Sequence, residues 1–292
     1  MFSNCHLHSI FSDGVYTPEQ LCDLAVKEGY RAVILTDHDT ARGSYFMNRA
    51  ARERGLLNIL GTEFYAVGFG VEFHLLGFDY NPDNKRMQAL LARASSRQTI
   101  KSKILFEEGL KRGSLRDGIS WQDVLDAFPY NDYFCNNQVF EVMVKRGIYK
   151  REEYFDEFLY PNFSNKISKG ICKELIEAAV QPIPHISEVA ETIIEAGGVP
   201  IVAHPTPNKR ALVKEILSVG VRGFETIHPS ITPEDRIFFD QVCTEMNLYK
   251  MGGTDHSGPL GGFDDNPNLQ CNKEDGYVSE ENFMKIYERR LG

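Results

Sequence analysis

The sequence has no long apolar run and no close pair of cysteines. No stretch approaches the roughly 20 apolar residues that a membrane-spanning helix needs. We therefore expect no membrane contact, and because no basic segment followed by an apolar one occurs near Met1, we expect a cytoplasmic protein. The six cysteines are isolated, which predicts reduced packing residues and argues against a disulfide framework or a zinc knuckle.

The sequence also lacks an excess of positive charge. Its formal net charge is −9. A protein that binds a nucleic-acid duplex through long-range electrostatic attraction to the phosphates is basic. We therefore expect no duplex-binding surface. A small anionic substrate is still compatible with this charge, because bound divalent cations reverse the local sign of an acidic site. The sequence carries no signature of an oligomeric state.

Several common catalytic motifs are missing as well. There is no GxxxxGK[ST] phosphate-binding loop, no complete dinucleotide fingerprint and no GxSxG nucleophile elbow. The chemistry must therefore come from other residues.

What the sequence does contain is an alternation of amphipathic segments with short apolar runs. Thr17 and Pro18 open a helix that Gly29 closes, and a second helix is expected over 42–54. Predicted strands are RAVILT, LLNILGTE, VEFHLLGF, VPIVAHP, VRGFETIH and LYKMGGTDH, with later helices at 186–196, 208–219 and 233–246. This rhythm predicts an α/β fold with a parallel sheet or barrel.

The rhythm stops after Asn81-Pro82 and returns at 186. Between these points the pattern is helical, without a convincing strand, and Pro182-Ile183-Pro184 marks the exit. We therefore expect one α/β domain over 1–80 and 186–292, interrupted by an inserted helical domain over 81–185 that caps the substrate.

Histidines and carboxylates cluster at the ends of the predicted strands. In a closed parallel barrel these ends meet at one face, where active sites are built. His6 and His8 form an HxH pair, and two positions apart on a strand both imidazoles point the same way. The predicted metal ligands are His6, His8, Asp13, His38, Glu63, His74, His204, Asp255 and His256.

Imidazole mixed with carboxylate suits Mn, Fe or Zn, and nine ligands suit two or three ions. A lone histidine beside a strand is more often structural, which is how we interpret His185. Asp37 and Asp39 are expected to orient His38. His228 follows the FETI strand and is predicted to line the substrate pocket, whereas the role of Glu225, within that strand, stays ambiguous. Arg93 and Arg97 fall on one helical stripe that is expected to bind substrate above the metals.

The motifs CHLHSIFSDG, LTDHDT, GTEF, the lone His74, VAHP and GGTDHSG resemble, in this order, the metal motifs of the PHP (polymerase and histidinol phosphatase) superfamily. The helix SSRQTIKSKILFEEGL is similar to that of small stand-alone PHP phosphoesterases that act on nucleotides. The resemblance implies a distorted (β/α)7 barrel with a trinuclear Mn, Fe or Zn site.

The resemblance also implies which residues hold each ion. His6, His8, Glu63 and Asp255 would hold the first ion, Glu63, His74 and His204 the second, and Asp13, His38 and His256 the third. A metal-bridging hydroxide would attack phosphorus. Within this set, Asp13, His38, Glu63 and His204 are the expected catalytic residues.

The sequence departs from the family in the insert. Related nucleotide phosphoesterases commonly carry an Arg-Pro-His-like motif there, whereas the matching segment here is Cys135-Asn136-Asn137-Gln138-Val139. This chain is therefore expected to recognise its substrate differently.

The leading hypothesis is a metal-dependent phosphoesterase that hydrolyses a small phosphorylated metabolite. Candidates are AMP, a nucleoside 3′,5′-bisphosphate, a cyclic ribose phosphate and a short RNA 5′ end. The alternatives are a metal-dependent C–N (amide) hydrolase, because the same ligands activate water for amides, and a non-catalytic metal- or nucleotide-binding module.

We expect the substitution His6→Ala to remove metal and activity together, because an HxH imidazole is lost from the first ion. Metal content after gel filtration and hydrolytic rate would be measured on the same preparation, with His185→Ala as the control. A fully active, metal-replete His6→Ala protein would refute the site.

Overall fold

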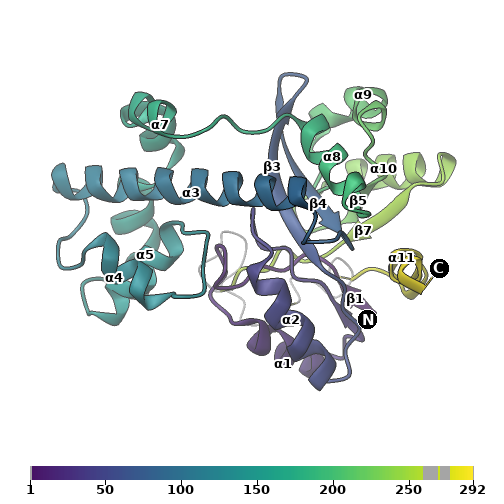
Figure 1. The fold of residues 1–292 in the computed structure, drawn as a ribbon, viewed down its shortest axis with the longest axis horizontal. Helices are drawn as coiled ribbons and strands as arrows, with labels where there is room; N and C mark the ends of the chain where they lie inside the picture. Colours follow the sequence, from purple (N-terminus) through teal and green to yellow (C-terminus); the bar gives the residue numbers. More distant parts are fainter. Residues whose placement is uncertain (1, 259–268, 270–276, 292) are drawn as a thin grey trace.

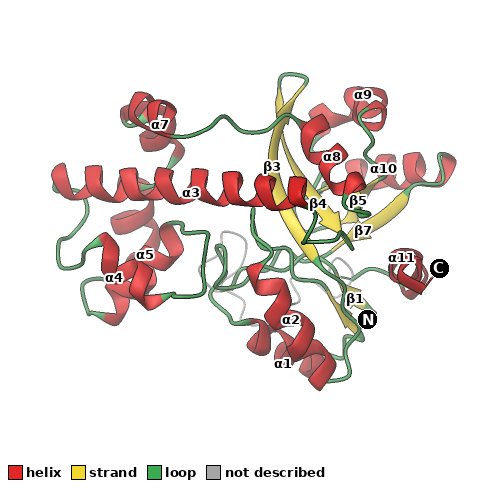
Figure 2. Cartoon of the chain, in the orientation of Figure 1, coloured by secondary structure: helices red, strands yellow, loops and turns green. Residues whose placement is uncertain are grey.

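The computed structural model describes residues 2–258, 269 and 277–291 of this mixed α/β chain. Two strands, β1 (Ser3–Asn4) and β2 (Ala32–Val33), form a parallel pair. A five-stranded sheet has the order β3 (Gly61–Gly68), β4 (Val71–Phe78), β5 (Val199–Val202), β6 (Gly223–Ile227) and β7 (Tyr249–Gly252). Figure 2 shows the strands on one side of the molecule and a largely helical part on the other.

The large sheet is mixed, which corrects the prediction of purely parallel strands. β3 and β4 pair antiparallel, as do β4 and β5, whereas β5, β6 and β7 run parallel. The reason is the turn between β3 and β4, which consists only of Phe69 and Gly70. Both have positive φ, 50° and 79°, as a two-residue hairpin requires, and so short a turn can only return the chain antiparallel.

Strand β3 also begins later than predicted. The sequence suggested a strand that ends at Glu63, but Glu63 is the third residue of β3. Residues 56–60 contribute only an isolated bridge from Leu57 to Ala32. Pairing with β4 decides the boundary, because Gly61 pairs with Phe78 and Gly68 with Val71.

Backbone hydrogen bonds connect the two sheets on both sides. The amide of Cys5 donates to Gly252 O (3.1 Å), and that of Asp255 donates to His6 O (2.9 Å). On the other side the amide of Asp39 donates to Glu63 O (2.8 Å). The segment after β1 therefore lies beside the segment after β7, and the segment after β2 lies beside β3.

The helices around the sheets agree with the predicted pattern. Thr17 caps α1 through a capping box with Gln20, and Gly29 ends it in the left-handed conformation. The predicted helix over 208–219 is divided into a 3-10 turn (Pro207–Leu212) and a shorter α-helix. These helices are α1 (Pro18–Glu28), α2 (Arg42–Glu53), α8 (Ile186–Glu195), α9 (Val213–Ser218), α10 (Pro233–Glu245) and α11 (Glu280–Tyr287).

The segment after β4 is helical. Helix α3 (Lys85–Lys111) runs from beside α8 to the group formed by α4, α5 and α7 (Figure 1). The others are α4 (Trp121–Ala127), α5 (Asn136–Lys145), a 3-10 turn (Arg151–Glu153), a π-helix (Tyr154–Leu159), α6 (Tyr160–Asn162), a second π-helix (Ile167–Ile171) and α7 (Lys173–Ala179). No helix in the described ranges combines the length and apolar character needed to cross a membrane.

The helical segment has a core of its own and rests on the loop after β1. Phe140 and Phe158 are fully buried in that core. The Nδ2 of Asn131 donates to Ile10 O (2.7 Å), and the Nδ2 of Asn137 donates to Asp13 O. The helical segment therefore holds the backbone of residues 10–13 in place.

We expect Phe140→Ala to lower the free energy of unfolding by about 3–5 kcal/mol, as for a large buried aromatic side chain. Phe140 is fully buried, and its ring centroid lies 4.8 Å from that of Phe158 and 4.9 Å from that of Tyr154. Urea denaturation followed by fluorescence would measure the loss. The matched control is Tyr130→Ala, since Tyr130 is 69% exposed; equal losses would contradict this core.

Candidate metal centre

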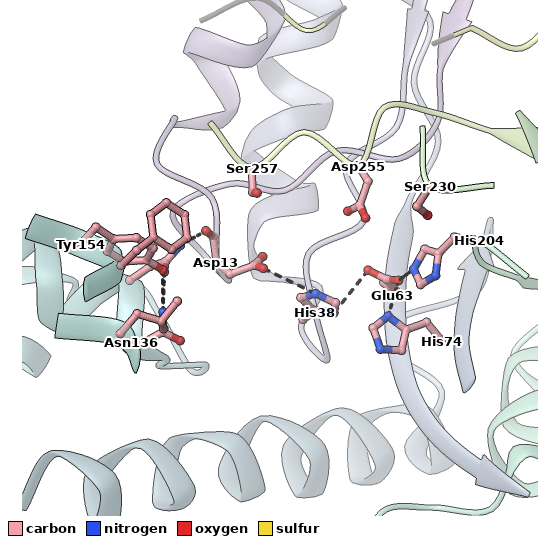
Figure 3. A pocket seen from close by; sticks show the side chains of 13 residues that line it. Asp13, His38, Glu63, His74, Asn136, Tyr154, His204, Ser230, Asp255 and Ser257 are labelled. Carbon is pink, nitrogen blue, oxygen red and sulfur yellow. Dashed lines mark hydrogen bonds and ion pairs between the residues drawn. The ribbon is translucent and has the colours of Figure 1, made fainter. Parts of the chain in front are cut away.

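A pocket of about 330 Å³ opens where the ends of the strands approach the helical segment. Figure 3 shows Glu63, His74, His204 and Asp255 on one side of it, Asn136 and Tyr154 on the other, and Asp13 and His38 between them. The pocket is lined by Asp13, His38, Glu63, His74, Asn136, Asn137, Tyr154, Phe155, Leu159, His204, Ser230, Asp255 and Ser257.

Glu63 lies at the centre of this arrangement. It is fully buried, and its two oxygens face different groups of imidazoles. Oε1 lies 2.8 Å from the Nδ1 of His74 and 3.0 Å from the Nε2 of His204. Oε2 lies 3.1 Å from the Nε2 of His6, 3.2 Å from the Nε2 of His8 and 3.3 Å from the Nδ1 of His38. This division suits a carboxylate that bridges two cations.

Two further carboxylates complete the cluster. Asp255 Oδ1 lies 2.9 Å from the Nε2 of His8 and 3.4 Å from that of His6. Asp13 Oδ1 lies 3.3 Å from the Nδ1 of His8, and its Oδ2 lies 3.6 Å from the Nε2 of His38. One compact group, His6, His8, Glu63 and Asp255, has the same four members as the predicted first-ion set.

Hydrogen bonds between neutral side chains do not account for these contacts. A neutral imidazole has one N–H and one lone pair, and an ionised carboxylate has only lone pairs. Yet in His6, His8 and His38 both ring nitrogens face carboxylate oxygens. Moreover, the Nε2 of His8 and the Nδ1 of His38 are buried and make no hydrogen bond despite these short distances. Lone pairs that converge in this way fit divalent cations.

The pKa values of His6 and Glu63 are shifted by the charged groups around them. Burial lowers the pKa of His6, but the charges of Glu225, Glu63 and Asp255 outweigh it and raise that pKa well above its usual value. For Glu63 burial raises the pKa, and the surrounding imidazoles, His6 foremost, bring it well below the usual value. A site that attracts protons so strongly also attracts metal cations.

Glu225 and Asp37 hold the ligands in position. Glu225, which the sequence left ambiguous, is fully buried; its Oε1 lies 3.0 Å from the Nδ1 of His6, and its Oε2 accepts from the amide of His204 (2.6 Å). The Asp37 carboxylate was expected to orient His38. It instead accepts hydrogen bonds from Ser9 and Ser12, because the loop after β1 folds over it. The turn between the two histidines and Asp13 is thereby fixed.

Three residues of the centre have left-handed backbone conformations. Asp39, His204 and Asp255 have φ of 51°, 25° and 54°. Such conformations are costly for residues other than glycine, and they persist where the surrounding structure determines them. Here the sharp turns direct the side chains of His204 and Asp255 into the cluster.

The two remaining predicted histidines also lie nearby. His228 is buried with its Nε2 3.3 Å from Asp255 Oδ2 and its Nδ1 2.8 Å from Ser230 Oγ. His256 is buried, and its ring stacks on that of Tyr16 at a centroid distance of 5.8 Å. His256 belongs to none of the compact ligand groups found among the described residues. Its role as a metal ligand stays a prediction.

Neither of the predicted basic residues, Arg93 and Arg97, lines this pocket. The guanidinium of Arg93 donates to Glu188 on α8. Arg97 lines a different pocket together with Lys101 and Lys169, and no lysine or arginine of the described chain lines the metal pocket. A substrate-binding role for Arg93 and Arg97 stays a prediction. The lining by Asn136, Asn137, Tyr154 and Phe155 was missed, because no local pattern marks a wall built by packing.

An α/β chain with a buried cluster of imidazoles and carboxylates is a candidate metallohydrolase. Residues 4–128 match the PHP domain family. This match confirms, for that segment, the resemblance seen in the motifs.

Similar proteins span nearly the whole chain. The 5′-3′ exoribonuclease of Haemophilus influenzae is 26% identical over 270 residues, which cover 90% of this chain and 93% of that protein. The phosphoribosyl 1,2-cyclic phosphate 1,2-diphosphodiesterase of Eggerthella lenta is 23% identical, with 89% of this chain and 96% of that protein covered. A solved structure, that of a proposed metal-dependent phosphoesterase from Bifidobacterium adolescentis, has a TM-score of 0.73 at 25% identity and covers 99% of this chain and 96% of its own.

We expect removal of metal with a chelator to lower the Tm, and Mn to restore it. At a metal concentration about 100 times the dissociation constant, binding to the folded state alone adds about 2.7 kcal/mol to its stability. Differential scanning calorimetry would measure the shift. Glu63→Gln should abolish the Mn-dependent shift, whereas the exposed Glu72→Gln should retain it. An Mn-dependent shift of unchanged size in Glu63→Gln would refute the bridging role.

Proposed function

We propose that the chain is a metal-dependent phosphoesterase that hydrolyses a small phosphorylated substrate, with a nucleotide or a short RNA 5′ end as the leading class. The observation that carries this proposal is the division of the Glu63 oxygens between two groups of imidazoles. Two cations a few ångströms apart suit phosphoryl transfer, because they clamp both the attacking and the leaving oxygen. The names of the Haemophilus and Eggerthella relatives support the same substrate class.

The ligand set supports two or three ions of Mn, Fe or Zn. We assign His6, His8, Glu63 and Asp255 to the first ion, and Glu63, His74 and His204 to the second. Asp13, His38 and His256 are assigned to the third. When bound, these ions supply Lewis-acid activation of water and of a phosphoryl oxygen.

The side chains of the centre then have distinct tasks. Glu63 holds both groups of imidazoles at fixed spacing, so little rearrangement accompanies the reaction. Asp13 and His38 lie toward the middle of the pocket, between the other ligands and the side chains of Asn136 and Tyr154, where the phosphate and its leaving group would lie (Figure 3). Ser230 and Ser257 offer further hydrogen bonds at the rim. His228 supports Asp255 through the contact of its Nε2 with Asp255 Oδ2.

We also propose that the seven strands form a distorted barrel and that residues 81–185 form an inserted domain that caps its open end. The hydrogen bonds from Cys5 to Gly252 and from Asp39 to Glu63 support closure of the strands into a ring. The separate hydrophobic core of the helical segment supports a domain of its own.

We expect the Mn-reconstituted protein to hydrolyse a phosphate ester of at least one of AMP, adenosine 3′,5′-bisphosphate, a cyclic ribose phosphate and a short 5′-phosphorylated RNA, and to lose this activity with a chelator. Glu225→Gln should lower activity about 10- to 100-fold, as is typical when the partner behind a metal-bound histidine is removed. Phosphate release from the monoesters would be measured by a colorimetric assay, and ring opening of the cyclic phosphate and mononucleotide release from the RNA by chromatography.

The control variant is Glu280→Gln, which changes an exposed glutamate at the start of α11. Amine release from a panel of amides would be measured beside phosphate. Amine release without phosphate release from any substrate would replace this proposal by C–N hydrolysis, and silence of both assays with metal bound would favour a binding role.

A further inference from the structure

The wall of the pocket that faces the metal centre has a different chemistry from the centre itself. It is formed by residues at the start of α5 and along the first π-helix. Its members are Asn136, Asn137, Tyr154, Phe155 and Leu159. These are amides and apolar or aromatic groups, and no charged residue of the described chain lies among them. This wall, which we call the helical wall, is suited to a flat, uncharged part of a ligand.

Hydrogen bonds determine the orientation of the side-chain amides in the helical wall, that is, which end is the oxygen and which is the NH₂. The carbonyl of Asp13 can only accept, so the group of Asn137 that contacts it must be the NH₂. Asn137 Oδ1 is therefore turned the other way, where it accepts from the Tyr154 hydroxyl (2.6 Å) and from Asn136 Nδ2 (2.8 Å). The tyrosine oxygen in turn accepts from the same Asn136 Nδ2 (2.8 Å).

This network leaves one group of Asn136 for a ligand. An amide nitrogen has two N–H groups, and both are directed to Asn137 and Tyr154. The Oδ1 of Asn136 accepts no hydrogen bond from the described residues, and in Figure 3 it lies on the side of His38. The pocket thus presents an acceptor that cannot exchange roles with a donor. A ligand group that fits here must carry an N–H or an O–H.

Phe155 supplies an apolar surface in the same wall. It lines the pocket and is 36% exposed, although a phenylalanine is usually buried. It belongs to a π-helix (Tyr154–Leu159). This conformation is rare in proteins, and where it occurs it is often at a functional site. An exposed ring at the rim of a polar pocket offers a stacking surface, and stacking on an aromatic ring is a common way to hold a base.

We propose that the helical wall binds the nucleobase of the substrate, with Phe155 stacked on the base and Asn136 Oδ1 accepting from its exocyclic amino group. This inference rests on the proposed phosphoesterase function, whose scissile phosphate would lie at the metal centre. Adenine, cytosine and guanine carry such an amino group, whereas hypoxanthine presents a carbonyl in its place. The segment that holds Asn136 is the one in which the chain departs from the Arg-Pro-His-like pattern, so recognition there relies on an amide instead of a cation.

The first test compares AMP with purine ribonucleoside 5′-monophosphate, which lacks only the amino group, and with IMP. Because AMP is itself a candidate substrate, dissociation constants would be measured by calorimetry on the Mn-loaded protein with the non-hydrolysable 5′-phosphonate forms of the three nucleotides. We expect AMP to bind about threefold to tenfold more tightly than the analogue without the amino group, the usual effect of one hydrogen bond. IMP should bind more weakly still, because its carbonyl faces Asn136 Oδ1.

The second test uses variants of the helical wall. Phe155→Ala should weaken AMP binding by about tenfold, within the range for loss of one base-stacking contact. Binding of ribose 5-phosphate, which has no base, should not change. Phe155→Tyr should behave like the unaltered protein, and Phe69→Ala is the matched control, since Phe69 is 38% exposed at the β3–β4 turn. Asn136→Ala should remove the discrimination between AMP and its analogue without the amino group.

The outcomes separate the two proposals. Equal affinities for AMP and its analogues, or a loss in Phe155→Ala that is the same for AMP and ribose 5-phosphate, would overturn the base-binding site. Selective AMP binding without phosphate release from any substrate would instead contradict the phosphoesterase function while the base-binding site stands.

Discussion

The structure depends on the placement of one buried carboxylate, that of Glu63, among the imidazoles of His6, His8, His38, His74 and His204. An isolated buried charge is strongly unfavourable, and so is a group of partly protonated imidazoles without counter-charge. The carboxylate and the imidazoles therefore stabilise each other, and divalent cations would be coordinated by both. The fold brings these side chains, which are far apart in the sequence, together at one point.

Short strands and rigid turns position these side chains. The left-handed turns at His204 and Asp255 direct their side chains inward, and Glu225 supports His6 and His204 from behind. The loop after β1 is held on one side by Asp37 and on the other by the helical segment, through Asn131 and Asn137. The centre is thus fixed largely by buried polar contacts, which suits chemistry that relies on preorganised charge.

Much of this could be predicted from the sequence where the signal is local. The Thr17 capping box, the left-handed Gly29 and the HxH pair follow from short-range rules and agree with the structure. Strand pairing is less local: β4 returns antiparallel because of the Phe69-Gly70 turn, and its pairing makes β3 start at Gly61, near the end of the predicted strand. The partners of long side chains are not local at all. Arg93 meets Glu188, and Asn136 joins Tyr154, only because α3, α5, α8 and the π-helix are packed in three dimensions.

The hydrogen bond from Asn137 to the carbonyl of Asp13 has a thermodynamic consequence. It joins the helical segment to the residue that closes the metal cluster, so order gained at one end of the pocket is shared by the other. If binding at one end orders the other through this contact, the coupling is reciprocal, and each ligand changes the affinity for the other by the same factor. Depletion of the metal would then also weaken binding of the organic part of the substrate.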